Sequence, residues 1–176
     1  MRFTETAIAG VWVIDPDFHV DDRGRFFRAW CLRDFSEHGI HFVPVQENIG
    51  FNLHKGTVRG MHYQGPPAVE AKLVRCTKGA IFDVALDLRA DSLTRGQWFG
   101  TELTADNGRM LYVPEHCAHG YQSLEDRTEM YYSTSQFYAP NTAYGARFDD
   151  PAFGIQWPMG PSAVSLQDRN WPLVQR

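Results

Sequence analysis

Two-residue alternation of side-chain character dominates this sequence and constrains its fold more than any other feature. In the segment 81–88, valine and leucine side chains fall on one face of an extended chain, while Asp83 and Asp87 fall on the other. Lys72 to Cys76 is another predicted strand, joined to this one through Thr77-Lys78-Gly79. Val58 to Gln64 also reads as strand.

Turn and helix signals place further elements along the chain. Those elements are a turn at Asp106-Asn107-Gly108 between strands Thr101–Thr104 and Met110–Val113, a strand from Thr128 to Tyr138, and a helix from Trp30 to His38 stopped by Gly39. Many short strands with Gly and Pro turns are typical of an all-β sandwich or barrel. A small barrel can leave a cavity lined by residues far apart in sequence.

Length and charge limit the classes of function. The 176 residues contain no repeat or linker, so we expect a single domain over residues 1–176. A net charge of −4 without a basic block argues against nucleic acid as a partner. We also expect no membrane partner, because no apolar run is long enough to span a bilayer. The N-terminus lacks a signal-peptide core, and Cys31, Cys76 and Cys117 read as reduced thiols, so we expect a cytoplasmic protein.

Three side chains near residue 60 suggest acid–base chemistry. His62 can accept a proton near neutral pH, Arg59 can bind phosphate, and Lys72 can stabilise a developing oxyanion. This set suits proton abstraction next to a carbonyl on a phosphorylated substrate. Tyr132, if buried, could deliver a proton from the face opposite a histidine base. Taken alone, His62 could equally be a structural histidine bonded to a carbonyl, and Tyr132 an ordinary strand aromatic.

Motifs in a fixed order along nearly the whole chain strengthen the functional interpretation. They are Asp22-Arg23-Gly24 with Phe26-Phe27, Gln46-Glu47-Asn48, Gly56 to Gln64, Lys72 to Cys76, Asp83 to Arg89, Pro114 with His119-Gly120, Tyr132, Tyr138-Ala139-Pro140, Asp149-Asp150-Pro151, Ile155 to Pro158, and Asp168. In this order and spacing, from about Ile8 to Pro172, the chain resembles the dTDP-4-dehydrorhamnose 3,5-epimerase family.

The resemblance implies a fold, an assembly and a reaction. The fold is a double-stranded β-helix (cupin, jelly-roll) barrel with a few short helices, and the assembly is a homodimer. The substrate is a nucleoside diphosphate 4-keto-6-deoxy sugar, epimerised at C3 and C5 without a cofactor or metal. His62 is the implied base, Asp168 its partner, Lys72 the group facing the C4 oxygen, and Tyr132 the acid on the opposite face.

Binding roles follow from the same resemblance. Arg23 and Arg59 match positions that hold the diphosphate, Tyr138 matches the aromatic that stacks on the base, and Phe26 lies in a nucleotide-proximal motif. Positions that contact sugar and phosphate are matched by Gln46, Asn48 and His119.

Three positions depart from the family pattern. Arg28 and Ala143 stand where an acidic residue is usual, and Gln167 stands where a lysine usually precedes Asp168. These positions belong to the nucleotide end rather than to proton transfer. We therefore hypothesise that the base or the sugar differs from thymidine and the rhamnose precursor.

Other functions stay open at this point. A 3-epimerase would use the same four catalytic residues. A metal-dependent cupin could use Glu70 and His119, although Gln64 is a poor ligand where a second histidine is common, and Lys72 would repel a cation. A sugar-binding module without activity would need no matched acid and base.

Overall fold

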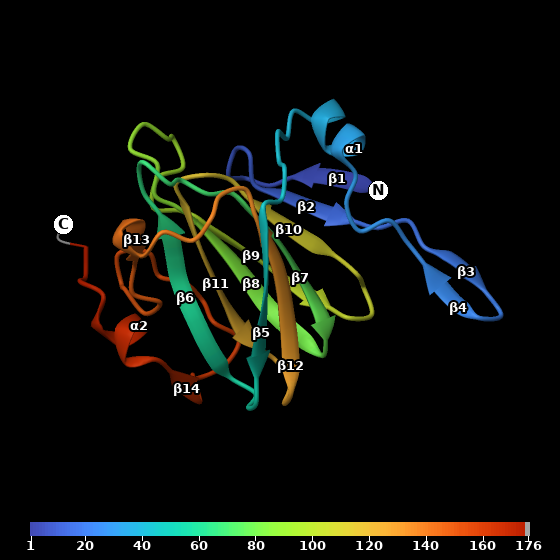
Figure 1. Cartoon of the computed structure of the whole chain (residues 1–176). Helices are drawn as coiled ribbons and strands as arrows, with labels where there is room; N and C mark the ends of the chain where they lie inside the picture. Colours follow the sequence, from blue (N-terminus) through green and yellow to red (C-terminus); the bar gives the residue numbers. More distant parts are fainter. Residues whose placement is uncertain (175–176) are drawn as a thin grey trace.

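Two β-sheets packed face to face form the body of the molecule, whose computed structural model describes residues 1–174 (Figure 1). The first sheet runs, in spatial order, β1 (Arg2–Glu5), β2 (Trp12–Asp15), β10 (Met110–Val113), β7 (Lys72–Lys78), β12 (Thr128–Thr134) and β5 (Gln46–Asn52). The second runs β13 (Ala143–Gly145), β6 (Thr57–Gln64), β11 (Cys117–Ser123), β8 (Ala80–Asp87) and β9 (Trp98–Thr104), with β14 (Ala163–Val164) parallel to β6. This architecture confirms the predicted jelly-roll barrel.

Alternation along β8 directs two sets of side chains to opposite faces of the second sheet. Ile81 and Ala85 join a cluster between the sheets, whereas Val84 and Leu86 join a cluster on the outer face. The predicted aspartate face is the inner one, and Asp83 and Asp87 are both 0% exposed. Buried carboxylates need partners, and the partner of Asp83 lies in the site described below.

Apolar clusters occupy three places around the barrel. One fills the space between the sheets and includes Val74, Leu111 and Tyr121. A second covers the outer face of the first sheet and includes Phe35 of helix α1 (Leu32–Glu37). The third lies outside the second sheet, where Phe153 and Trp157 pack against it. The core between the sheets leaves one part of the barrel interior unfilled.

The element predictions are largely confirmed, with four differences. Thr128–Tyr138 was too long a strand, because Thr134 Oγ1 donates to the Gln136 carbonyl at 2.8 Å and the chain turns. Helix α1 begins two residues after the predicted start at Trp30. Gly39, at φ 73°, follows the end of the helix as predicted. The turn at 106–108 joins β9 to β10 in the other sheet. Helices α2 (Leu166–Asn170) and η1 (Pro140–Thr142) were not predicted.

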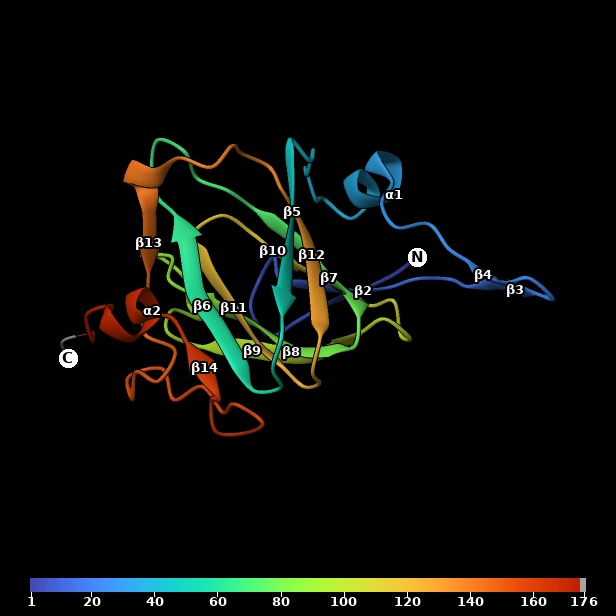
Figure 2. The same ribbon diagram turned by 60° about the horizontal axis from the view of Figure 1, so that its bottom comes forward.

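A hairpin of β3 (His19–Asp21) and β4 (Gly24–Phe26) projects away from the barrel (Figure 2). All six of its strand residues are exposed. The helices of residues 1–174 are at most six residues long, and none is long and apolar enough to cross a membrane.

Candidate active site

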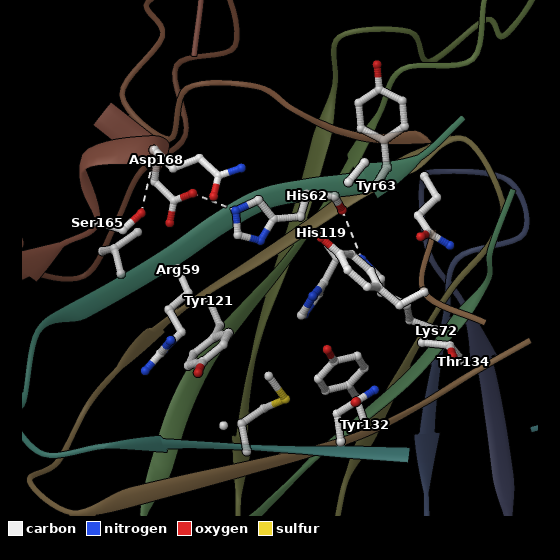
Figure 3. A pocket seen from close by; sticks show the side chains of 18 of the residues that line it. Arg59, His62, Tyr63, Lys72, His119, Tyr121, Tyr132, Thr134, Ser165 and Asp168 are labelled. Carbon is white, nitrogen blue, oxygen red and sulfur yellow. Dashed lines mark hydrogen bonds and ion pairs between the residues drawn. The ribbon is translucent and has the colours of Figure 1, made fainter. Parts of the chain in front are cut away.

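A cavity of about 920 Å³ lies between the two sheets. Its lining comes from β5, β6, β7, β11, β12, β13 and β14, from the segment after β14, and from the loops that hold Glu70 and Tyr138. The ionisable side chains that line it are Arg59, His62, Tyr63, Glu70, Lys72, His119, Tyr121, Tyr132, Tyr138, Tyr144 and Asp168. Residues from distant parts of the sequence therefore meet around one open cavity (Figure 3).

His62 and Asp168 form a hydrogen-bonded pair on one wall of the cavity. The Nε2 atom of His62 lies 2.5 Å from Asp168 Oδ1, and the side chains are 43% and 5% exposed respectively. Burial raises the pKa of Asp168, but the hydrogen bond and charge of His62 outweigh it and lower that pKa below the ordinary value. An ionised carboxylate at Nε2 leaves Nδ1 of His62 directed into the cavity (Figure 3).

Asp168 reaches this position because its carboxylate binds the edge of β6 between two strands that pair with that edge. Strand β14 pairs with β6 at Thr57 and Val58, and β13 pairs with it from His62 onward. Between them, the Gly60 N–H donates to Asp168 Oδ2 at 3.3 Å. Ser165 caps the helix, since its Oγ accepts from the Asp168 N–H at 3.0 Å. One carboxylate thus satisfies a backbone donor and orients the imidazole.

Lys72 lies at the start of β7 and is almost fully buried. Its Nζ is 3.1 Å from Glu70 Oε1, and each side chain is 9% exposed. The same Nζ donates to the His62 carbonyl at 3.0 Å. A buried cation that lines the cavity and is held by two fixed acceptors can stabilise an oxyanion without reorganising.

Tyr132 projects from β12 on the wall opposite His62 (Figure 3). Because β12 and β6 belong to different sheets, the two side chains enter the cavity from opposite sides. Burial, followed by the negative charge of Glu70, raises the pKa of Tyr132. The phenol therefore stays protonated at neutral pH and can donate.

A second imidazole–carboxylate pair lies deeper in the barrel. His119 is the cross-strand neighbour of His62, and its Nε2 lies 2.8 Å from Asp83 Oδ1. Burial raises the pKa of Asp83. Since His119 is held by Asp83 and Glu70 by Lys72, the residues of the metal alternative have other partners. No group of three or more possible metal-ligating side chains occurs within residues 1–174.

The other predicted binding residues that line the cavity are Arg59, Gln46, Asn48 and Tyr138. Arg59 donates from Nε to Asn52 Oδ1 at 2.9 Å. Gln46 donates to Asn48 Oδ1 at 3.2 Å, and the buried Nδ2 of Asn48 has no partner among the described residues. Tyr138 lies on the loop after β12, lines the cavity and is 62% exposed.

Arg23 and Phe26 lie outside this cavity. Both belong to the projecting hairpin; Arg23 pairs with Asp21, and Phe26 is 73% exposed. Arg28 is also remote and faces Asp34 at 3.6 Å. Ala143 and Gln167, by contrast, line the cavity.

Sequence reasoning missed several cavity residues. Tyr121, Tyr144 and Trp171 line the cavity. Asn52, which does not line it, is hydrogen-bonded both to Tyr121 and to Arg59. A buried asparagine or a lone tryptophan has no local pattern that marks a site, so only the fold could reveal them.

Known proteins of similar sequence and structure share this arrangement of the chain. The model of the family described as dTDP-4-dehydrorhamnose 3,5-epimerase matches residues 5–176. An enzyme of that name from Methanothermobacter thermautotrophicus is 38% identical, over 97% of this chain and 92% of that protein. The dTDP-4-dehydrorhamnose 3-epimerase of Streptomyces niveus is 36% identical, over 97% and 82%.

A solved structure agrees with the sequence comparisons. The dTDP-4-dehydrorhamnose 3,5-epimerase from Bacillus anthracis, determined with TDP and PPi bound, superposes with a TM-score of 0.95 at 35% identity, covering 98% of this chain and 99% of that one. Fold and site together define a cupin-type barrel equipped for acid–base chemistry. More particularly, the chain belongs to the dTDP-4-dehydrorhamnose 3,5-epimerase family.

Proposed function

We propose that this chain epimerises a nucleoside diphosphate 4-keto-6-deoxy sugar at C3 and C5. The observation that carries the proposal is the placement of His62 and Tyr132 on opposite walls of one cavity, with Lys72 buried beside them. Inversion of a carbon next to a ketone requires a base on one face and an acid on the other. The family to which the chain belongs is described as dTDP-4-dehydrorhamnose 3,5-epimerase, and the Methanothermobacter thermautotrophicus relative has the same name.

The proposed mechanism assigns one step to each group. His62 Nδ1 removes the proton from the carbon next to the C4 ketone, and Asp168 stabilises the resulting imidazolium. The electron pair moves onto the C4 oxygen, where Lys72 stabilises the enolate by an amount on the order of a few kcal/mol. Tyr132 then protonates the carbon from the opposite face. Proton removal and return leave the oxidation state unchanged, so the chemistry needs no redox cofactor.

The remaining cavity residues are proposed to bind the substrate. Arg59 holds a phosphate, Gln46, Asn48 and His119 contact sugar and phosphate, and Tyr138 stacks on the base. The unpartnered Asn48 Nδ2 supports this assignment, because a buried donor without a partner is costly unless a ligand supplies one.

The nucleotide end of the cavity differs from the family pattern. Ala143 and Gln167, which line the cavity, carry no charge. We therefore propose that the base or sugar differs from thymidine and the rhamnose precursor. Calorimetry with dTDP-sugars and other NDP-sugars tests this: comparable affinities are expected, and a clear preference for dTDP-sugars would contradict it.

We further propose that residues 1–176 act as one domain in a homodimer, in which each hairpin serves the partner's cavity. Arg23 and Phe26 lie away from the cavity of their own chain, on a hairpin whose strand residues are all exposed. The outer face of β5 also exposes Ile49 and Phe51, which a second copy would cover.

Mixing two defective variants tests the exchanged hairpin. Sedimentation should first show a dimer. Arg23→Ala and His62→Ala chains, unfolded and refolded together in equal amounts, should recover about one quarter of the wild-type sites, since half the dimers are mixed and each mixed dimer has one complete site. No recovery in a confirmed dimer would place Arg23 in its own chain's site, and an Arg23→Ala chain that was fully active alone would place it outside any site.

The chain is proposed to act in the cytoplasm. Its Cys31, Cys76 and Cys117 are all free thiols, as suits a reducing compartment. The reaction itself is tested by incubation with a 4-keto-6-deoxy NDP-sugar in D₂O. Deuterium at C3 and C5 supports 3,5-epimerisation, whereas deuterium at C3 alone supports the 3-epimerase alternative represented by the Streptomyces niveus relative. No incorporation from any such NDP-sugar would contradict the proposed function.

A further inference from the structure

Helix α2 carries Asp168 but has no apolar anchor of its own. The helix is five residues long, and helices of this length are not stable in isolation. Asp168 is its only buried residue, and Leu166 is 79% exposed. Contacts outside the helix must therefore hold the carboxylate against His62.

Trp171 supplies an apolar contact directly after α2. It is the C-terminal cap residue of the helix, and its half-buried indole packs against Gly145 in β13. Gly145 is in turn the register partner of His62 in the β13–β6 pair. The indole thus lies against the backbone that neighbours the proposed base, three residues along the chain from the carboxylate that orients it.

The fit between Trp171 and Gly145 leaves no room for a larger residue. A Cβ atom at position 145 would lie 2.2 Å from indole Cε2 and 2.3 Å from indole Nε1. Both contacts are far inside van der Waals distance, and a planar ring cannot bend away. The glycine is therefore required for this contact.

On the basis of the proposed function, we propose that Trp171 is a positioning residue, whose contact with Gly145 fixes α2 so that the Asp168 carboxylate meets His62. Two polar contacts flank this segment: the Ser165 cap before Asp168, and the Val174 N–H, which donates to Asp150 Oδ2 at 2.8 Å. Between them, Trp171 is the one apolar side chain that is not exposed. Its removal would leave the helix held by polar contacts alone: the two that flank the segment and those of the Asp168 carboxylate itself.

Trp171→Ala should reduce kcat strongly and ligand affinity little. A displacement of about 1 Å at a catalytic group costs about 100-fold in rate, and we expect a loss of that order. Because Trp171 also lines the cavity, direct contact with the ligand is the competing role. Calorimetry with dTDP distinguishes the two: the affinity should change less than about threefold, which corresponds to under 1 kcal/mol. A large loss of dTDP affinity with kcat retained would overturn the proposal.

A double-mutant cycle tests whether Trp171 acts through Asp168. In the Asp168→Asn background, Trp171→Ala should have almost no further effect on kcat, whereas a merely structural role would give additive losses. Trp171→Ala should also displace the pH–rate profile in the same direction as Asp168→Asn. Trp171→Phe, which keeps an aromatic contact, should recover most of the rate.

Gly145→Ala provides the matched steric test. It should lower kcat in the wild-type chain but be nearly neutral in the Trp171→Ala chain, because the clash partner is then absent. Leu166→Ala, an exposed change on the same helix, is the control and should leave kcat unaltered. Normal proton exchange by Trp171→Ala would refute this inference alone, whereas absence of exchange in the wild-type chain would refute the proposed function.

Discussion

Replacing Asp168 by asparagine keeps the shape of the side chain but reverses one of its hydrogen bonds. The carboxylate accepts at both oxygens: Oδ1 faces His62 Nε2 at 2.5 Å, and Oδ2 accepts from the Gly60 N–H at 3.3 Å. An amide presents one oxygen and one NH₂ group. The Gly60 N–H is a fixed backbone donor, so the amide oxygen must turn toward it and the NH₂ group toward His62.

The reversed amide selects the wrong tautomer of His62. Nε2 must then accept a hydrogen bond, and the ring proton moves to Nδ1, which is directed into the cavity (Figure 3). A protonated Nδ1 cannot remove a substrate proton. The equivalent change in serine proteases lowers kcat about 10⁴-fold, or about 5 kcal/mol of transition-state stabilisation. We expect Asp168→Asn to lose about 10³- to 10⁴-fold in kcat by the same cause.

Deuterium wash-in at C3 of a 4-keto-6-deoxy NDP-sugar in D₂O measures this loss directly. Asp168→Ala is the comparison, because it removes the acceptor without imposing a tautomer. Asp168→Asn should exchange more slowly than Asp168→Ala although it unfolds at a higher temperature. An asparagine variant that exchanged within tenfold of wild type, or faster than the alanine variant, would refute the tautomer argument.

Three further changes test other parts of the structure. Tyr132→Phe should reduce net inversion at least about 100-fold. Because burial and then the charge of Glu70 raise the pKa of Tyr132, the wild-type pH–rate profile should show no loss of rate on the alkaline side below about pH 9. Such a loss would contradict the assignment of Tyr132 as the acid. Lys72→Met should lower the free energy of unfolding by about 3–5 kcal/mol, because it leaves Glu70 buried without its cation. Adding Glu70→Gln should restore stability, measured by denaturant unfolding, but not turnover, measured by steady-state kinetics. Asp87→Asn should lower the free energy of unfolding by about 2 kcal/mol at pH 7. Burial raises the pKa of Asp87, but hydrogen bonds from Arg89, Ser92 and Thr94 lower that pKa by more, so the stabilisation is present above the pKa of the unfolded chain and is lost as pH falls through the folded value. The unfolding free energy of the variant should therefore vary less than that of wild type between about pH 5 and pH 2.

Local periodicity predicted the strands because alternation is a property of neighbouring residues. The same periodicity separated Asp83 and Asp87 from the apolar face of β8. It could not say that the aspartate face is the inner one, because that depends on which sheet lies opposite. The predicted strand through Tyr138 was too long for a similar reason: side-chain hydrogen bonds stabilise the turn after Thr134, and residue propensity does not encode them.

Local sequence patterns could not predict contacts between residues that are distant in the sequence. Asp168 is separated from His62 by 106 positions, and only the family resemblance suggested that they meet. Arg23 and Phe26 were expected near the substrate, yet they project from the barrel, and only the proposed homodimer would bring them to a cavity. The contact of Trp171 with Gly145 has no sequence signature, since a tryptophan after a short helix is compatible with many structures.

In the proposed mechanism, His62 removes the proton next to the ketone. Wash-in of deuterium at C3 by His62→Ala, measured by NMR beside the wild-type chain at equal substrate saturation, tests it most directly. Loss of a general base should slow exchange by about 10² to 10⁴, with dTDP binding preserved in calorimetry. A His62→Ala chain that bound dTDP and exchanged at the wild-type rate would contradict the claim.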